Sequence, residues 1–322
     1  MIPAELQQQL ADIETQLENY RQQLLADRRK AFAISGSIAG ACALLALLAL
    51  ALESPGLGIP AVIGVILPLA YLGSRSSSIA NAYRSAYKRE INSAILRHFS
   101  PDLQYNANDG ISSGEFKNCN LFSGSVDRFS SQDLVSGSYG KTKLRFSQLH
   151  AEEKHTERTK NGTRTYYTTI FEGILFIADF NKEFHSRTYV RTDHAEKLLG
   201  NFGRFFQKFS LGAEKLVQLE NPEFEKEFAV YTGDQVEARY ILSPSLMERL
   251  LALKKRCKTE TQFAFQNSTV TIAIANHDLL FNPDFAKPAN DQVQLENLYH
   301  RFEFFLDIVD DLDLNTRIWS KE

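Results

Sequence analysis

Two long apolar runs constrain the fold of this chain more than any other feature. Residues 31–52 and residues 54–74 contain no charged side chain, and only Glu53 separates them. At a rise of about 1.5 Å per residue, a helix of either length crosses a hydrocarbon layer of about 30 Å. Ser54, Pro55 and Gly56 are typical turn residues. The two runs therefore predict an antiparallel transmembrane hairpin, and the alternative is a pair of buried helices in a soluble core.

Small residues indicate where the two spans pack closely. Gly36 and Gly40 lie four residues apart, Ala39 belongs to a neighbouring row with the same spacing, and Gly64 lies in the second run. Small residues at this spacing let helix backbones approach each other. They are predicted to pack the two spans together or to form a dimer, and the spacing does not choose between these.

Flanking charges predict the orientation of the hairpin. Arg28, Arg29 and Lys30 precede the first run, several basic residues follow the second, and the connecting turn has none. The positive-inside rule then places both termini in the cytoplasm. A cleaved signal peptide is the alternative, but the segment before the first run and the run itself are both too long for one.

Helices are predicted to continue on both sides of the hairpin. In residues 1–30 apolar side chains recur every 3.5 residues on average, which is the period of a coiled coil. Residues 75–100 show a similar apolar face and end before Pro101. We expect these two segments to form a cytoplasmic helical stalk, with pairing of residues 1–30 between chains as the alternative.

The remainder, residues 101–322, is predicted to be a cytoplasmic α+β domain with a mostly antiparallel sheet and a few helices. We expect a division of this domain into two sub-lobes that meet near residues 211–226. A polar linker is expected at residues 105–110, and a closing helix carries Leu298, Phe302 and Phe305 on one face. Predicted strands are residues 115–122, 133–136, 141–150, 165–178, 185–191, 227–233, 235–242, 261–267, 269–275 and 278–283, with a helix after Pro244.

Three blocks carry a resemblance to a known family: DLVSGSYGKTKLRFSQLHAEEK, FEGILFIADFNKEFHSRTYV and LENPEFEKEFAVYTGDQVEARYILSPSLMERL. With the spacing between them, they resemble a bacterial membrane-protein family catalogued as domain of unknown function 3137. The resemblance implies a two-span hairpin followed by a cytoplasmic α+β domain, in the bacterial cytoplasmic (inner) membrane. It supplies no activity, cofactor or catalytic residue.

Two motifs in the first block suggest chemistry at first sight. Gly140, Lys141 and Thr142 match the end of a phosphate-binding loop, but Val135 stands where its first glycine should be. The expected structure is a tight turn between Gly137 and Gly140, which joins two strands. In HAEEKH the two histidines are five residues apart, which does not put them on one helix face. This segment is predicted to be a strand end that runs into a charged loop at residues 152–163. We expect no catalytic, cofactor-binding or metal-binding residues.

Basic residues near apolar ones are the candidates for contact with a membrane or a partner. Arg204 and Lys208 lie beside an apolar helical face, and Lys254, Lys255 and Arg256 end another predicted helix. Anionic lipid head groups or a partner protein would suit both places. The alternatives are a core helix for the first and a solvated helix end for the second. Residues 101–322 contain 27 basic and 32 acidic residues, a balance that argues against nucleic-acid binding.

The predicted function follows from these features. An integral membrane protein with two spans presents its α+β domain to a protein partner, a second copy of itself or an anionic lipid, without catalysis or a cofactor. Tethering raises the effective concentration of such a domain for other membrane-associated molecules. A membrane-anchored, hydrolase-like enzyme is the alternative.

Overall fold

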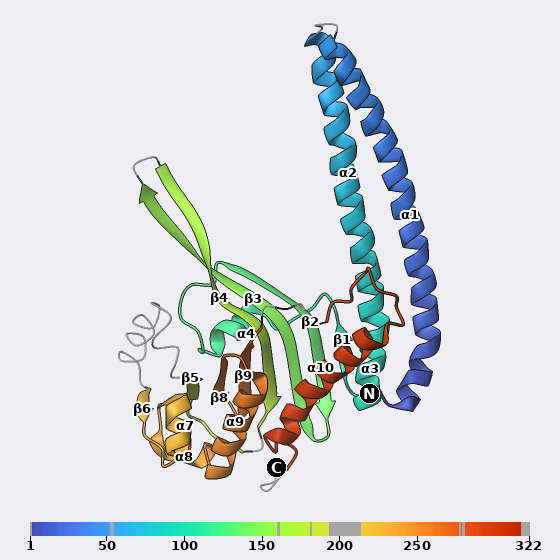
Figure 1. Cartoon of the computed structure of the whole chain (residues 1–322). Coiled ribbons are helices and arrows are strands. Elements are labelled where there is room, and N and C mark those ends of the chain that lie inside the picture. The colour runs from blue at the N-terminus through green and yellow to red at the C-terminus, as the bar shows by residue number, and fades with distance from the viewer. Residues whose placement is uncertain are drawn as a thin grey trace. The chain divides into compact units, whose positions relative to one another are not determined.

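The computed structural model describes residues 2–51, 55–159, 162–180, 182–192, 214–276, 278 and 281–316 (Figure 1). The chain divides into two compact units. The first unit contains residues 1–94 and 281–299, and the second contains residues 95–280 and 300–322.

Two long helices form most of the first unit. α1 (Ala4–Ala51) and α2 (Pro55–Tyr87) lie side by side in opposite directions (Figure 1). A short π-helical stretch, η1 (Lys88–Asn92), leads into α3 (Ser93–Phe99), which ends before Pro101 as expected. The predicted apolar faces are confirmed in part: Leu6, Leu10, Leu17, Ile79, Tyr83, Tyr87 and Ile91 are buried, whereas Ile13, Tyr20 and Leu24 are half-buried.

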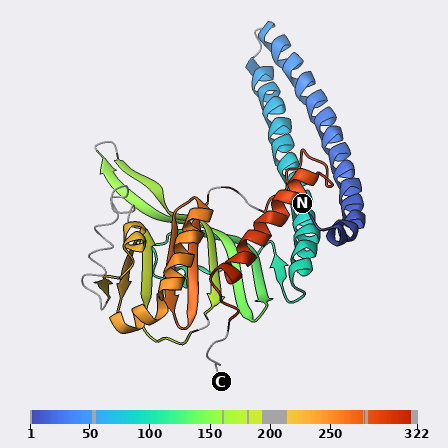
Figure 2. The same cartoon turned by 60° about the horizontal axis from the view of Figure 1, so that its bottom comes forward.

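An antiparallel sheet forms the second unit (Figure 2). Within the described residues it has nine strands in the order β1-β2-β3-β4-β9-β8-β5-β7-β6. The strands are β1 (Gln104–Asn106), β2 (Arg128–Tyr139), β3 (Thr142–Thr159), β4 (Gly162–Asp179), β5 (Thr188–Thr192), β6 (Lys215–Val217), β7 (Phe228–Thr232), β8 (Thr261–Gln266) and β9 (Thr269–Ala275). The helices are α4 (Ser113–Asn118), α7 (Pro222–Glu227), α8 (Gln235–Ile241), α9 (Pro244–Cys257) and α10 (Gln292–Asp311), which begins in the first unit. The α+β fold with a mostly antiparallel sheet is confirmed.

Both faces of the central strands are buried, which explains why their sequences show little alternation. On one face, Phe146 stacks on Phe176 and contacts Phe305 of α10, with a ring-centroid distance of 4.9 Å to Phe305. On the other face, Phe116 of α4 lies in a cluster with Phe171 and other buried side chains. Strands buried on two sides read as continuous apolar runs.

Two predicted strands are helices in the structure. Residues 115–122 overlap α4, which begins at Ser112 with a capping box: the Ser112 side chain accepts from the Glu115 amide, and Glu115 accepts from the Ser112 amide. Residues 235–242 form α8, whose first amides donate to the Asp234 side chain. Side chains that satisfy the free amides at the start of a helix outweighed the weak strand pattern.

Two predicted loops, one turn and one further strand were also wrong in whole or in part. The predicted charged loop at residues 152–163 consists largely of strand, because β3 and β4 continue to residues 159 and 162. The expected linker at 105–110 contains part of β1. The turn between β2 and β3 lies at Gly140-Lys141, two residues later than predicted, and Gly140 adopts a φ of 61°. Within residues 278–283, the described positions form bends and turns and contain no strand.

Candidate functional site

Apolar side chains cover the outer surface of α1 and α2. Both helices are long and apolar enough to cross a membrane, and only 6% of the residues in the most apolar part of each are buried. Leu44 is 69% exposed and Leu67 is 63% exposed. The other exposed members of this apolar belt are Phe32, Ile34, Ile38, Leu45, Leu47, Leu48, Val62, Ile63, Ile66, Leu69 and Tyr71. Helices in a soluble core bury such side chains, so this surface is suited to an apolar surrounding.

Charged residues mark the ends of the apolar belt. Arg28, Arg29 and Lys30 come immediately before it on α1, and Arg75 comes immediately after it on α2. The guanidinium of Arg28 lies over the ring of Phe32, 5.7 Å from its centroid. Positive side chains at this level can reach lipid head groups while their stems cover apolar surface.

The predicted packing residues divide between two surfaces. A Cβ added at Gly64 would lie 2.5 Å from the Cys42 sulfur, so Gly64 lies at the contact between α1 and α2. A Cβ at Gly36 or Gly40 would meet nothing within 4 Å, and both residues are exposed. Ala39 is half-buried. Of these three glycines, Gly64 therefore packs the two helices against each other, and Gly36 and Gly40 do not.

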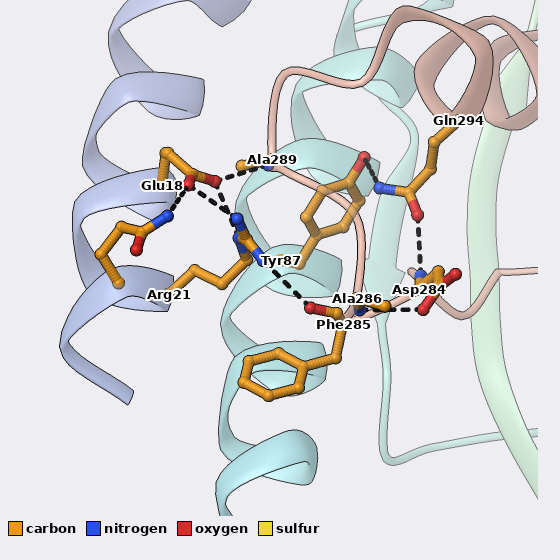
Figure 3. A network of polar contacts seen from close by, with 9 residues as sticks. Glu18, Arg21, Tyr87, Asp284, Phe285, Ala286, Ala289 and Gln294 are labelled. Carbon is orange, nitrogen blue, oxygen red and sulfur yellow. Dashed lines mark hydrogen bonds and ion pairs between the residues drawn. The ribbon is translucent and has the colours of Figure 1, made fainter. Parts of the chain in front are cut away.

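A polar clamp joins α1 to residues 281–291, which lie far along the chain (Figure 3). Arg21 donates from Nε and Nη2 to the two carboxylate oxygens of Glu18, both at 2.9 Å. Its Nη1 donates to the Phe285 carbonyl at 3.2 Å, and the Ala289 amide donates to Glu18 at 2.9 Å. We call Glu18, Arg21, Phe285 and Ala289 the clamp. Its bidentate charge pair fixes the direction of both side chains.

Hydrogen bonding sets the titration of the clamp. The bonds from Arg21 are the main reason why the pKa of Glu18 falls to about 2, and the bond to Glu18 raises the pKa of Arg21. Arg21 is buried, and the Glu18 carboxylate compensates its charge. Neither residue lies in the apolar runs.

Aromatic rings extend the clamp toward α2. Tyr83 packs on Phe285 at 5.3 Å between ring centroids and on Tyr87 at 5.9 Å. Gln294 donates to the Tyr87 hydroxyl at 3.4 Å and accepts from the Asp284 amide at 2.7 Å. Burial raises the pKa of both tyrosines. The network holds residues 284–294 on both helices through charge, hydrogen bonds and contacts between tilted rings.

The basic candidates for membrane or partner contact have different environments. Lys254 forms an ion pair with Glu227 and lies 4.9 Å from the Phe228 ring centroid. Arg256 donates to Asp307 at 2.8 Å and to Asp311 at 2.6 Å. Lys255 is exposed. Arg204 and Lys208 lie outside the described residues.

The phosphate-loop motif lies at the turn between β2 and β3, and both histidines lie on β3. The Lys141 amide and the Thr142 hydroxyl both donate to the side-chain oxygen of Asn315, so this turn binds another part of the same chain. His150 lies 3.2 Å from the Thr169 hydroxyl, and His155 lies 2.7 Å from the Thr168 hydroxyl. The predicted hairpin is confirmed, with its turn shifted as described above. Among the described residues, no group of three or more His, Cys, Asp or Glu side chains is arranged to hold a metal ion.

The clamp was not predicted from the sequence. Glu18 and Arg21 are three residues apart on one helix, a spacing at which opposite charges meet, and that signal was available. Their other partners lie about 270 residues later, and nothing local in the sequence indicates them.

Comparison with known proteins gives one family. No curated protein sequence matches the chain. A solved structure, the mycobacterial trehalose monomycolate transport factor A, is similar with 11% identity and a TM-score of 0.31, covering 71% of this chain and 97% of that one. Nothing about fold or function is inferred from so low a score. Residues 169–314 match the family described as protein of unknown function (DUF3137), which confirms over this segment the family expected from the sequence blocks.

Proposed function

We propose that this chain is an integral membrane protein whose two-helix hairpin anchors an α+β binding domain at the cytoplasmic face of the bacterial inner membrane. The domain binds a protein partner, a second copy of the chain or anionic lipid head groups. Its contribution is to concentrate and position a binding surface for membrane-associated molecules.

The exposed apolar belt carries this proposal. In water, each square ångström of exposed apolar surface costs about 25 cal/mol relative to burial, and thirteen large side chains on α1 and α2 are exposed together. A lipid hydrocarbon layer removes that cost without protein contacts. The length of each apolar run fits the thickness of such a layer.

The flanking charges support a cytoplasmic location for both termini. The basic residues 28–30 and Arg75 border the belt on the side away from the connecting turn. Positive side chains are retained on the cytoplasmic side during insertion. The polar clamp, which lies beyond these charges along α1, needs an aqueous or protein surrounding and suits the same side.

Reporter fusions after residue 53 and after residue 322 test the topology. The expected result is an external signal at residue 53 and a cytoplasmic signal at residue 322. An external signal from residue 322 would overturn the proposed orientation, and release of the chain by alkaline extraction of membranes would overturn the anchor.

Partner capture tests the binding function. Crosslinking in native membranes, followed by identification of crosslinked molecules, is expected to enrich a protein, a second copy or an anionic lipid. The matched control is the same chain with Leu44→Arg, which should leave the sheet intact and remove the anchor. Equal enrichment by both chains would contradict a function that depends on tethering.

A further inference from the structure

The arm formed by β3 and β4 extends beyond the rest of the sheet (Figure 1). We define the arm as residues 152–159 and 162–169. β9 pairs with β4 only at residues 173–179, and β2 pairs with β3 only up to Glu152. Each strand of the arm therefore has its partner on one side and an edge on the other.

The other edges of the sheet are formed by short strands. The strands at the two ends of the sheet, β1 and β6, have three residues each. Short edge strands give little backbone for a foreign strand to pair with. On the β3 side of the arm, the Lys154 amide already donates to the Asp127 carboxylate at 2.8 Å.

The direction of each amide in the arm follows from these bonds. The Glu152 carbonyl accepts from the Asp127 amide, and the Lys154 amide donates to the Asp127 carboxylate. The backbone amides and carbonyls of even-numbered residues in β3 therefore point away from β4. Lys154 and Thr156 face Tyr167 and Thr165 on β4. In an antiparallel pair, two residues that face each other either both point their backbone amides and carbonyls toward the partner strand or both point them away from it. Thr165 and Tyr167 therefore point their amides and carbonyls to the outer edge of β4.

That outer edge is long, and no described strand pairs with it. In the described part of the chain, no hydrogen bond joins the outer side of residues 163–169 to another segment. The stretch reads TRTYYTT, has one charge and contains no proline. Threonine and tyrosine favour strands and form favourable pairs across them. This edge has the properties of a site for strand addition.

We propose that the outer edge of β4 pairs antiparallel with the same edge of a second copy of this chain. Two-fold symmetric dimers use one patch twice, and a two-fold axis perpendicular to a sheet makes the paired strands antiparallel. The stretch is suited to self-pairing because its single charge, Arg164, faces Thr168 of the other copy when the axis lies at Tyr166, and Ile170 when it lies at Tyr167. The inference names a partner for the anchored domain, and anchoring raises the chance of the encounter.

A series of single cysteines tests the pairing in membranes of the full chain. The native cysteines are replaced, with alanine at the buried Cys119, and one cysteine is placed at each position from 163 to 169. At a strand rise of about 3.4 Å, the separation between equivalent residues grows by roughly 7 Å per position from the axis. Disulfide yield should therefore peak at one residue and fall steeply on both sides. A flat profile or no crosslink would overturn the proposal.

A matched pair of prolines separates edge pairing from damage to the arm. Thr165→Pro removes an outward amide from the β4 edge, whereas Thr156→Pro removes one from the β3 edge opposite. In the chain with the peak cysteine, Thr165→Pro should lower the dimer yield by roughly tenfold, since two related bonds are lost. Thr156→Pro should leave it nearly unchanged. Equal loss from both variants would contradict the assigned edge.

Two further results distinguish this inference from the proposed function. Alkaline extraction is measured on the same membranes. A sharp crosslink peak in a chain that is released by alkali would overturn the anchor alone, and an anchored chain without a peak would overturn the self-pairing alone. If none of the cysteine variants forms a crosslinked dimer, but Thr165→Pro blocks the capture of another protein, the edge would be assigned to that protein.

Discussion

Large apolar side chains have opposite environments in the two units. On α1 and α2, Leu44 and Leu67 are mostly exposed, whereas Ile272 of β9 and Phe263 of β8 have no exposed surface. In the sheet, helices and neighbouring strands supply the apolar contacts. On the hairpin the protein supplies few, so these side chains stay exposed on its surface. The comparison teaches that equally apolar side chains are buried by the protein in one unit and left on its surface in the other.

The largest expected effect comes from removing a side chain that is packed inside the sheet. Phe263→Ala should lower the free energy of unfolding by about 3–5 kcal/mol, because it leaves a cavity in a closely packed core. Denaturant unfolding of the purified chain in detergent measures this. Leu67→Ala is the control and should change the same transition little, and equal losses would mean that Leu67 is packed by protein.

A charge placed in the apolar belt tests whether the belt inserts into a membrane. Leu44→Arg should raise the free energy of insertion by about 2.5–3.5 kcal/mol, the cost of arginine near the centre of a spanning helix. The measurement is the fraction of chain that resists alkaline extraction. Val293→Arg, at a 60% exposed position outside the belt, should insert normally. If Leu44→Arg inserts equally well, the belt faces water.

The clamp is a polar contact in the same unit as the exposed apolar belt, and it tests whether protein contacts stabilise that unit. Arg21→Ala should cost about 1–3 kcal/mol, since it leaves the Glu18 carboxylate without its charged partner. Hydrogen exchange at the Ala289 amide should become faster. Arg89→Ala, which removes an exposed ion pair with Glu90, is the control and should have little effect.

The two glycine surfaces of the hairpin offer a smaller test. Gly64→Ala crowds the Cys42 sulfur and should cost about 1 kcal/mol, while Gly40→Ala should cost less because its added methyl meets no atom. Unfolding of the helices in SDS, followed by circular dichroism, compares them. Adding Cys42→Ala to Gly64→Ala should restore stability, and failure of that rescue would argue against the contact.

The smallest effect is the pH dependence of the clamp. The pKa of Glu18 is lowered from 4.5 to about 2 in the folded chain, so its contribution to stability is complete above pH 4.5. As the pH falls from 4.5 toward 2, protonation removes that contribution. Exchange at the Ala289 amide, corrected for its intrinsic pH dependence, should become faster across this interval. The Glu18→Gln variant should show no such change.

Local patterns predicted the parts of the structure that depend on local interactions. The apolar runs gave both long helices, and the spacing of Leu298, Phe302 and Phe305 gave α10. Residues 235–242 were predicted to be a strand because of a short apolar alternation, but the capping side chain of Asp234 favours a helix there. The arm was misread because its charged residues resemble a loop, although β3 and β4 satisfy each other's backbone groups there.

The sequence by itself determined the two apolar helices, the α+β class and the family resemblance. Each rests on residues close together in the chain, where periodicity and length carry the information. Only the tertiary structure decided that Gly64 rather than Gly36 or Gly40 packs the helices, that Arg21 reaches Phe285, and that β4 keeps an open edge. These depend on residues up to 264 positions apart, and their meeting is set by the packing of whole elements.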